Sequence, residues 1–216
     1  MNQELISRYK DFLEKVLTPD RLRHSLGVMQ VMEELAVVYE LDQEKAAIAG
    51  LLHDAGKDLS PALQKQFIEE AGLAIEPYSN LDYTLYLHGP VGAYFVQKEL
   101  GITDALIFDA IYMHAFCGEG ENFNSPFVWC LRFSDILDPH RRLSNERLPL
   151  ERKWFLEGKS KLRRAVFSGK ISEAALFHTG WIIMMFDEKN FPIHPNMRKV
   201  YQELSFQLKV GDAFWA

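Results

Sequence analysis

The chain has 216 residues, of which 48% are hydrophobic, and it carries a formal net charge of −6. This length can bury one substantial core, while the negative charge argues against a nucleic acid polymer or an anionic membrane surface as partner, since both bind clustered positive charge. No run of about eighteen uncharged apolar residues occurs. Residues 1–16 are charged and amphipathic and lack the apolar middle of a secretory signal, so we expect a cytoplasmic protein.

Helix start signals recur along the chain and predict an all-α fold. Thr18, Ser60 and Ser125 each precede a proline, which places a capping hydroxyl before a residue suited to the first helical position. Asp42 is a further predicted cap. Helices are predicted over residues 19–39, 42–54, 61–71, 90–100, 104–114, 126–137, 150–167, 172–188 and 196–208. No alternating strand pattern of useful length interrupts them.

The predicted helices are expected to form one domain over residues 1–200. Its core would cover about residues 18–140 and its C-terminal helices residues 145–200, with residues 201–216 as an extension. The extension could pack on the domain or on a second subunit, so a homodimer is left open. Cys117 and Cys130 are too few for a disulfide framework and are expected to be reduced thiols.

The helix predicted over residues 42–54 should be the most buried, because residues 46–52 are small and apolar all round. It ends in His53-Asp54. A buried ionised carboxylate is costly to desolvate, so either cations neutralise Asp54 or the helix ends at the surface there. Adjacent helical side chains point about 100° apart, so both can reach one metal cluster only near a helix end. Gly56 supplies that end.

Four more residues with metal-binding side chains lie on or beside apolar helices. His24 borders the apolar stripe of its helix, His88 precedes a predicted helix, His114 ends one, and Asp135 interrupts an apolar run. Each alone could be an ordinary core or interface residue. Together they supply the nitrogen and oxygen ligands that iron, manganese, cobalt or zinc accept, and a carboxylate can bridge two such ions. The pattern favours a buried two-metal site.

Six short segments carry a resemblance to a known family and together span about residues 18–200: residues 21–28, 51–57, 88–93, 110–114, 135–141 and 193–195. The order of a histidine, a distant His-Asp doublet and a later aspartate resembles the HD superfamily of metal-dependent phosphohydrolases. Within it, the chain is most similar to the YqeK-type symmetrical diadenosine tetraphosphate hydrolases. The resemblance implies an HD-domain helical bundle with the metal site at its centre.

The same resemblance implies a ligand set for two divalent metal ions, with iron expected first and manganese, cobalt or zinc as alternatives. Asp54 would bridge both ions. The other ligands would divide between them, His24, His53 and Asp135 holding one ion and His88 and His114 holding the other.

The expected chemistry follows from such a centre. A hydroxide shared by two cations can attack phosphorus, so Asp54 would be catalytic as the bridging ligand and no protein nucleophile is needed. Lys57 lies one helical turn beyond His53 and is expected to contact a phosphate and to assist catalysis. Arg21 and Arg141 could bind substrate through planar two-donor forks. For all three cations, a solvated surface position is the alternative.

The implied function is symmetrical hydrolysis of a dinucleoside polyphosphate, such as diadenosine tetraphosphate, to ADP. Hydrolysis of another nucleotide or phosphate ester, a di-iron oxygenase of the HD type and a non-catalytic nucleotide-sensing module are the alternatives. The chain departs from the family pattern at Ala115, where relatives typically carry threonine, and over residues 118–125, a longer stretch than usual. Both changes bear on which small molecule fits, since loops around a fixed centre commonly set specificity.

Overall fold

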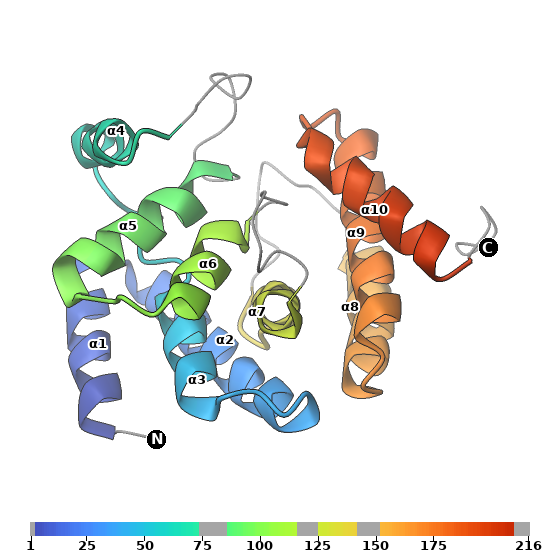
Figure 1. The fold of residues 1–216 in the computed structure, drawn as a ribbon, viewed down its shortest axis with the longest axis horizontal. Helices are drawn as coiled ribbons and strands as arrows, with labels where there is room; N and C mark the ends of the chain where they lie inside the picture. Colours follow the sequence, from blue (N-terminus) through green and yellow to red (C-terminus); the bar gives the residue numbers. More distant parts are fainter. Residues whose placement is uncertain (1–2, 74–85, 116–124, 142–151, 210–216) are drawn as a thin grey trace. The chain divides into compact units, whose positions relative to one another are not determined.

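The computed structural model describes residues 3–73, 86–115, 125–141 and 152–209 (Figure 1). All regular secondary structure in these ranges is helical, which confirms the predicted all-α class. The helices are α1 Gln3–Val16, α2 Pro19–Val38, α3 Gln43–Leu52, α4 Pro61–Glu70, α5 His88–Leu100, α6 Ala105–Met113, α7 Pro126–Leu137, α8 Arg152–Phe167, α9 Ile171–Glu188 and α10 Pro195–Gln207. None of these helices is long and apolar enough to cross a membrane.

The chain divides into two compact units, Met1–Arg141 and Arg142–Ala216. The first unit ends one residue past the predicted core. A single domain over residues 1–200 stays a prediction, as does the extension over residues 201–216, of which 210–216 lie outside the described ranges. Cys130 is a free, buried thiol, as expected, and Cys117 also lies outside them.

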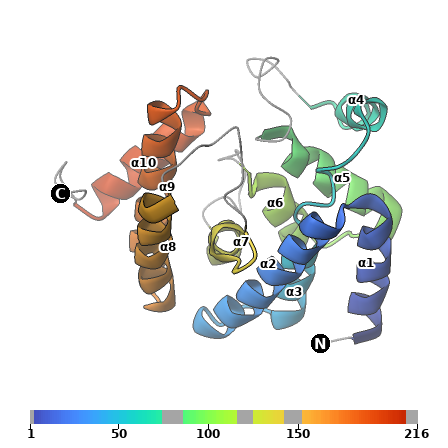
Figure 2. The same ribbon diagram turned by 180° about the vertical axis from the view of Figure 1, so that it is seen from behind.

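Helix α3 is the centre of the first unit. It packs most extensively on α2, beside which it lies in both ribbon views, and it also contacts α1, α6 and α7 (Figures 1 and 2). Residues 46–52 of α3 are all buried, as their small apolar character predicts. At Gly50 a Cβ atom would lie 2.8 Å from the Cα of Met29, so this glycine lets α2 and α3 approach backbone to backbone.

Three of the four predicted caps are confirmed. The side chains of Asp42, Ser60 and Ser125 accept hydrogen bonds from backbone N–H groups at 3.0, 3.4 and 3.3 Å respectively. The capping prediction for Thr18 is wrong, although α2 does begin at Pro19. The Thr18 hydroxyl accepts no hydrogen bond from the start of α2 and instead donates to the charged Oδ2 of Asp58 at 3.2 Å.

The beginning of α5 differs from the prediction by two residues. The helix starts at His88 rather than at Pro90, because Leu87 already has right-handed helical angles (φ −86°, ψ −19°). Pro90 then occupies the first turn, where a missing N–H has no helical partner to lose. His88 is therefore fixed on a helix rather than in the loop before it.

Two glycine contacts bring three chain segments together in the first unit. A Cβ atom on Gly56 would lie 2.8 Å from the Cα of Gly92 and from the carbonyl oxygen of His88. A Cβ atom on Gly89 would lie 2.9 Å from the carbonyl oxygen of Tyr112. The turn after α3, the start of α5 and the end of α6 therefore meet at main-chain distance.

The second unit contains α8, α9 and α10, with α9 packed against both others. Trp181 of α9 is buried, and its ring lies where a Cβ atom on Gly158 of α8 would be, at 2.4 Å. Its ring centroid is 5.7 Å from that of Trp154. His194 caps α10 by accepting a hydrogen bond from the N–H of Asn196 at 3.2 Å. These residues pack the unit internally.

Candidate metal centre

The six predicted metal ligands all lie in the first unit. Five of them lie at or near the ends of four helices, and His24 lies within a fifth, α2. Four of them are buried, and the side chains of His24 and Asp135 are only 14% and 17% exposed. His53 and Asp54 follow α3, His88 begins α5, His114 follows α6 and Asp135 lies on α7.

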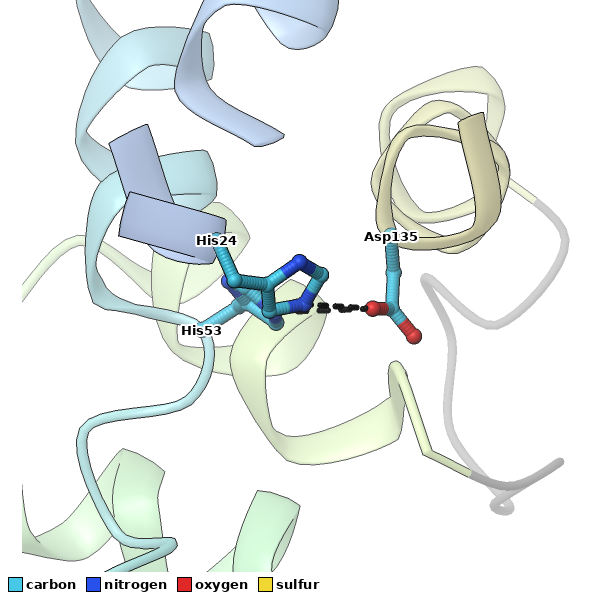
Figure 3. Close-up of side chains that lie close together, drawn as sticks. All are labelled: His24, His53 and Asp135. Carbon is cyan, nitrogen blue, oxygen red and sulfur yellow. Dashed lines mark hydrogen bonds and ion pairs between the residues drawn. The ribbon is translucent and has the colours of Figure 1, made fainter. Parts of the chain in front are cut away.

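One group of ligands consists of His24, His53 and Asp135, whose side chains point toward one another in Figure 3. Nε2 of His24 lies 2.9 Å from Oδ1 of Asp135, and Nε2 of His53 lies 3.8 Å from the same oxygen. The three ligand atoms lie within 4.8 Å of one another. This group can hold one metal ion.

Asp54 lies between this group and the remaining histidines. Its Oδ1 is 3.3 Å from Nε2 of His88 and 3.4 Å from Nε2 of His114, while its Oδ2 is 3.8 Å from Nε2 of His24. Ligand atoms of Asp54, His53 and His114 also lie within 4.8 Å of one another. Nε2 of His53 is also 3.6 Å from Oδ1 of Asp54, so this oxygen faces three histidines and Oδ2 faces His24. The two oxygens contact different histidines, as those of a bridging ligand can.

The protonation of two histidine rings fits a bound cation. Nδ1 of His53 donates to the carbonyl oxygen of Gly50 at 2.8 Å, and Nδ1 of His114 donates to that of Ile111 at 2.7 Å. A neutral ring with a proton on Nδ1 presents a lone pair at Nε2. Nε2 of His53 is buried and lacks a hydrogen-bond partner among the described residues, and Nε2 of His114 faces a carboxylate oxygen. A cation between these acceptors satisfies both.

Burial keeps two of the histidines in the neutral state that binds metal. It lowers the pKa of His88 to about 3 and lowers that of His114 as well, so both rings are neutral near pH 7. His24 differs, since burial lowers its pKa but hydrogen bonds with Asp135 and Asp138 raise it to about 9. Metal binding at His24 therefore displaces a proton.

Two predicted substrate cations lie against the carboxylates. Nζ of Lys57 is 3.1 and 3.0 Å from the two oxygens of Asp54, and Arg141 donates to Oδ1 of Asp135 and, at 2.7 Å, to its backbone oxygen. Burial opposes ionisation of both aspartates, but Lys57 and Arg141 outweigh it and hold their pKa values well below the usual range. The ligand carboxylates are therefore charged.

Arg21 is engaged elsewhere. Its Nε donates to Oδ1 of Asp58 at 2.6 Å, and the N–H of Thr18 donates to Oδ2 of the same carboxylate at 3.0 Å. Asp58 thus ties the turn after α3 to the start of α2. This role of Asp58 has no signal in the sequence, because nothing in the local pattern indicates partners 37 and 40 positions away.

Asp138 is a second residue whose role could not be predicted from the sequence, although it lies in the segment 135–141 that resembles the HD family. It is fully buried at the end of α7. Its Oδ2 lies 2.6 Å from Nδ1 of His24, and its Oδ1 accepts from the N–H of His140 at 2.9 Å. Its burial could not be inferred from the flanking Pro139 and His140, which are polar or turn-forming residues.

The family model of the HD domain matches residues 21–156, which include all six ligands. The chain belongs to the HD domain family. It is 29% identical to a symmetrical bis(5'-nucleosyl)-tetraphosphatase of Halalkalibacterium halodurans over 89% of this chain and 93% of that protein. It is 35% identical to the enzyme of the same description from Bacillus subtilis over 60% of this chain and 67% of that protein.

A solved structure gives the same assignment. The crystal structure of a predicted HD superfamily hydrolase involved in NAD metabolism, from Clostridium acetobutylicum, has a TM-score of 0.78 and 27% sequence identity. The similarity covers 94% of this chain and 97% of that one. The resemblance inferred from sequence is confirmed, and the chain is an HD-domain hydrolase with a His/Asp cluster suited to divalent metal ions.

Proposed function

We propose that this HD-domain hydrolase is a metal-dependent phosphohydrolase that cleaves a dinucleoside polyphosphate symmetrically, with diadenosine tetraphosphate giving two ADP. The observation that carries the proposal is the cluster of four histidines and two aspartates, in which Oδ1 of Asp54 faces His88 and His114 and Oδ2 faces His24. The two tetraphosphatase relatives support the choice of substrate, one of them over nearly its whole length.

The proposed ligand assignment keeps two ions. His24, His53 and Asp135 would hold one, His88 and His114 the other, and Asp54 both. When bound, divalent ions supply an activated hydroxide at neutral pH and neutralise phosphoryl oxygens. The nitrogen and oxygen donors accept iron, manganese, cobalt or zinc. Iron is proposed first because the resemblance to the HD family implies it. The chain's own contribution is to keep the two aspartates ionised and His88 and His114 neutral in a largely buried place.

Substrate binding is assigned to the cations of the cluster. Lys57 lies 3.0 Å from Oδ2 of Asp54, so a phosphate beside Asp54 would be within its reach, and Lys57 is also proposed to assist the reaction. Arg141 contacts Asp135 and offers a planar fork for phosphate oxygens. Arg21 is proposed as a third substrate contact, for which it would have to leave Asp58. Cations around the cluster favour an anionic phosphate over an uncharged substrate.

The test is product analysis with protein loaded separately with iron(II), manganese or cobalt under reducing conditions. Diadenosine tetraphosphate should yield two ADP per molecule, resolved by chromatography. AMP plus ATP would contradict symmetrical cleavage. An inert protein would be tested on mononucleotides and other phosphate esters and then for oxygen consumption, which would identify an oxygenase. Nucleotide binding without any turnover would indicate a sensing module.

Two variants make this experiment specific. Asp54→Asn should abolish hydrolysis, because the proposed bridge is lost. Asp187→Asn removes a carboxylate that pairs with Arg198 on the surface of the second unit, and it should leave hydrolysis unchanged. A cytoplasmic location and the absence of nucleic acid polymers and membranes as partners stay predictions from composition. Homodimer formation can be tested on the same preparation by measuring its molecular size in solution.

A further inference from the structure

We propose that Asp138 is a positioning residue of the metal centre, whose carboxylate orients His24 for metal binding, and that Gly27 is required because it provides the space for this carboxylate. The inference rests on the proposed metal site but not on the identity of the substrate. It concerns a residue outside the six ligands.

The geometry of Asp138 fixes the ring of His24. Oδ2 of Asp138 lies 2.6 Å from Nδ1 of His24, and this carboxylate is fully buried, so water does not compete for the contact. A carboxylate oxygen accepts, which keeps a proton on Nδ1 and leaves Nε2 for the ion. Nε2 of His24 points to Oδ1 of Asp135 at 2.9 Å, the direction in which the metal ligand must face.

Both the backbone and the side chain of Asp138 are held in place. Its N–H donates to the carbonyl oxygen of Ser134 at 2.9 Å at the end of α7, and its Oδ1 accepts from the N–H of His140 at 2.9 Å. Both carboxylate oxygens therefore have partners, and the side chain cannot rotate without losing one of them. The position of α7 therefore determines, through Asp138, how the His24 ring on α2 is oriented.

His24 differs in this respect from the two other histidines whose Nδ1 partners are described. His53 and His114 donate from Nδ1 to the neutral carbonyl oxygens of Gly50 and Ile111. A carboxylate partner makes the imidazole a more basic ligand than a carbonyl partner does. His24 also lies within a helix and is partly exposed, whereas His53 and His114 follow helix ends and are buried.

Gly27 supplies the second, independent observation. It lies within α2, one turn after His24, where glycine destabilises a helix relative to alanine and where no turn calls for it. A Cβ atom at this position would lie 1.8 Å from Oδ1 and 2.8 Å from Cγ of Asp138. The side chain of Asp138 fills the space that any other residue at position 27 would occupy.

Cobalt(II) binding tests the proposal without any substrate. Affinity is measured by competition with a chelator, and the visible spectrum reports the ligand geometry. Asp138→Ala should weaken cobalt binding roughly 10–100-fold, the usual effect of losing such a partner. Asp138→Asn should weaken it less, because an amide oxygen can still accept from Nδ1. Gly27→Ala should resemble Asp138→Ala, because its methyl group displaces the carboxylate.

The double variant Gly27→Ala with Asp138→Ala separates this mechanism from general damage. If Gly27 serves only to admit the carboxylate, the double variant should bind cobalt no more weakly than Asp138→Ala alone. If the loss of cobalt affinity in the double variant equals the product of the two single losses, the role of Gly27 is overturned. Unchanged cobalt affinity and spectrum in both Asp138→Ala and Asp138→Asn would overturn the role of Asp138. If Asp138→Ala does not fold, the test is made with Asp138→Asn and Gly27→Ala.

Thermal unfolding of the metal-free variants and the surface variant Asp187→Asn serve as controls. Asp187→Asn should match the unchanged protein in cobalt affinity. A loss of affinity in this variant equal to that of Asp138→Ala would overturn the proposal as non-specific. If the unchanged protein binds no cobalt, the proposed function fails together with this inference. If it binds cobalt and the Asp138 variants bind equally well, only this inference fails.

Discussion

The Nε2 atoms of His88 and His114 lie 3.0 Å apart, although the two residues are separated by 26 positions. Gly89 allows this contact, because the start of α5 approaches the end of α6 there at main-chain distance. Both nitrogens also lie within 3.4 Å of Oδ1 of Asp54. The three atoms define the second metal position of the proposed centre.

Replacing His88 with alanine should therefore remove one ion and keep the other, because His24, His53 and Asp135 are untouched. The expected metal content falls from two ions per chain to one, measured by elemental analysis after gel filtration. His178→Ala, a histidine of the second unit, is the matched control and should keep both ions. Loss of both ions from His88→Ala would show that the two positions are not separable in this way.

Replacing Asp54 with alanine should remove both ions and all turnover, since each of its oxygens faces a different set of histidines. The same elemental analysis measures the ions, and chromatography of the products measures turnover. Full metal content in this variant would exclude the bridging assignment. Asp187→Asn is the control for loss of a carboxylate.

Replacing Lys57 with alanine should leave the metal bound and lower kcat/KM. A hydrogen bond to a charged group contributes about 1.5–3 kcal/mol, which corresponds to a loss of roughly 10–100-fold. Lys57→Arg should recover part of the rate by keeping the positive charge. The measurement is steady-state kinetics at fixed metal content. An unchanged rate would reduce Lys57 to a counter-ion of Asp54.

Removing the metal should lower the thermal stability of the protein. A ligand that binds only the folded state stabilises it by about 2.7 kcal/mol when the free ligand concentration is about 100 times the dissociation constant. For a protein of this size, that corresponds to a rise of roughly 5–10 °C in Tm. Calorimetry with and without a chelator gives the shift. The Asp54→Ala variant should show no dependence on the chelator, and an equal shift there would mean that the stabilising ion binds elsewhere.

Local signals explain which parts of the fold could be predicted from the sequence. Helices begin at Pro19, Pro61 and Pro126 as expected, because a proline and the residue before it act on their own backbone. The burial of α3 followed from its composition. The start of α5 was placed two residues late, since the helical angles of Leu87 depend on its surroundings rather than on Pro90 alone.

Only part of the candidate site could be predicted from the sequence. The order of the six ligands along the chain indicated convergence, and the structure brings them together. The carboxylates that support them were not predictable. Asp138 reaches His24 across 114 positions and Asp58 reaches Arg21 across 37, and no spacing rule connects residues so far apart. Such contacts depend on how α2, α3 and α7 pack.

The contact of Gly56 with Gly92 has a consequence for how the family can vary. Because the segments carrying His53, Asp54 and His88 touch through main-chain atoms, no side chain sets the distance between them at this contact. Substitutions in the surrounding helices can change the packing of the core without moving the ligands. An identity of only 29% to a relative is therefore compatible with an unaltered ligand spacing, while the surroundings stay free to adapt to another substrate.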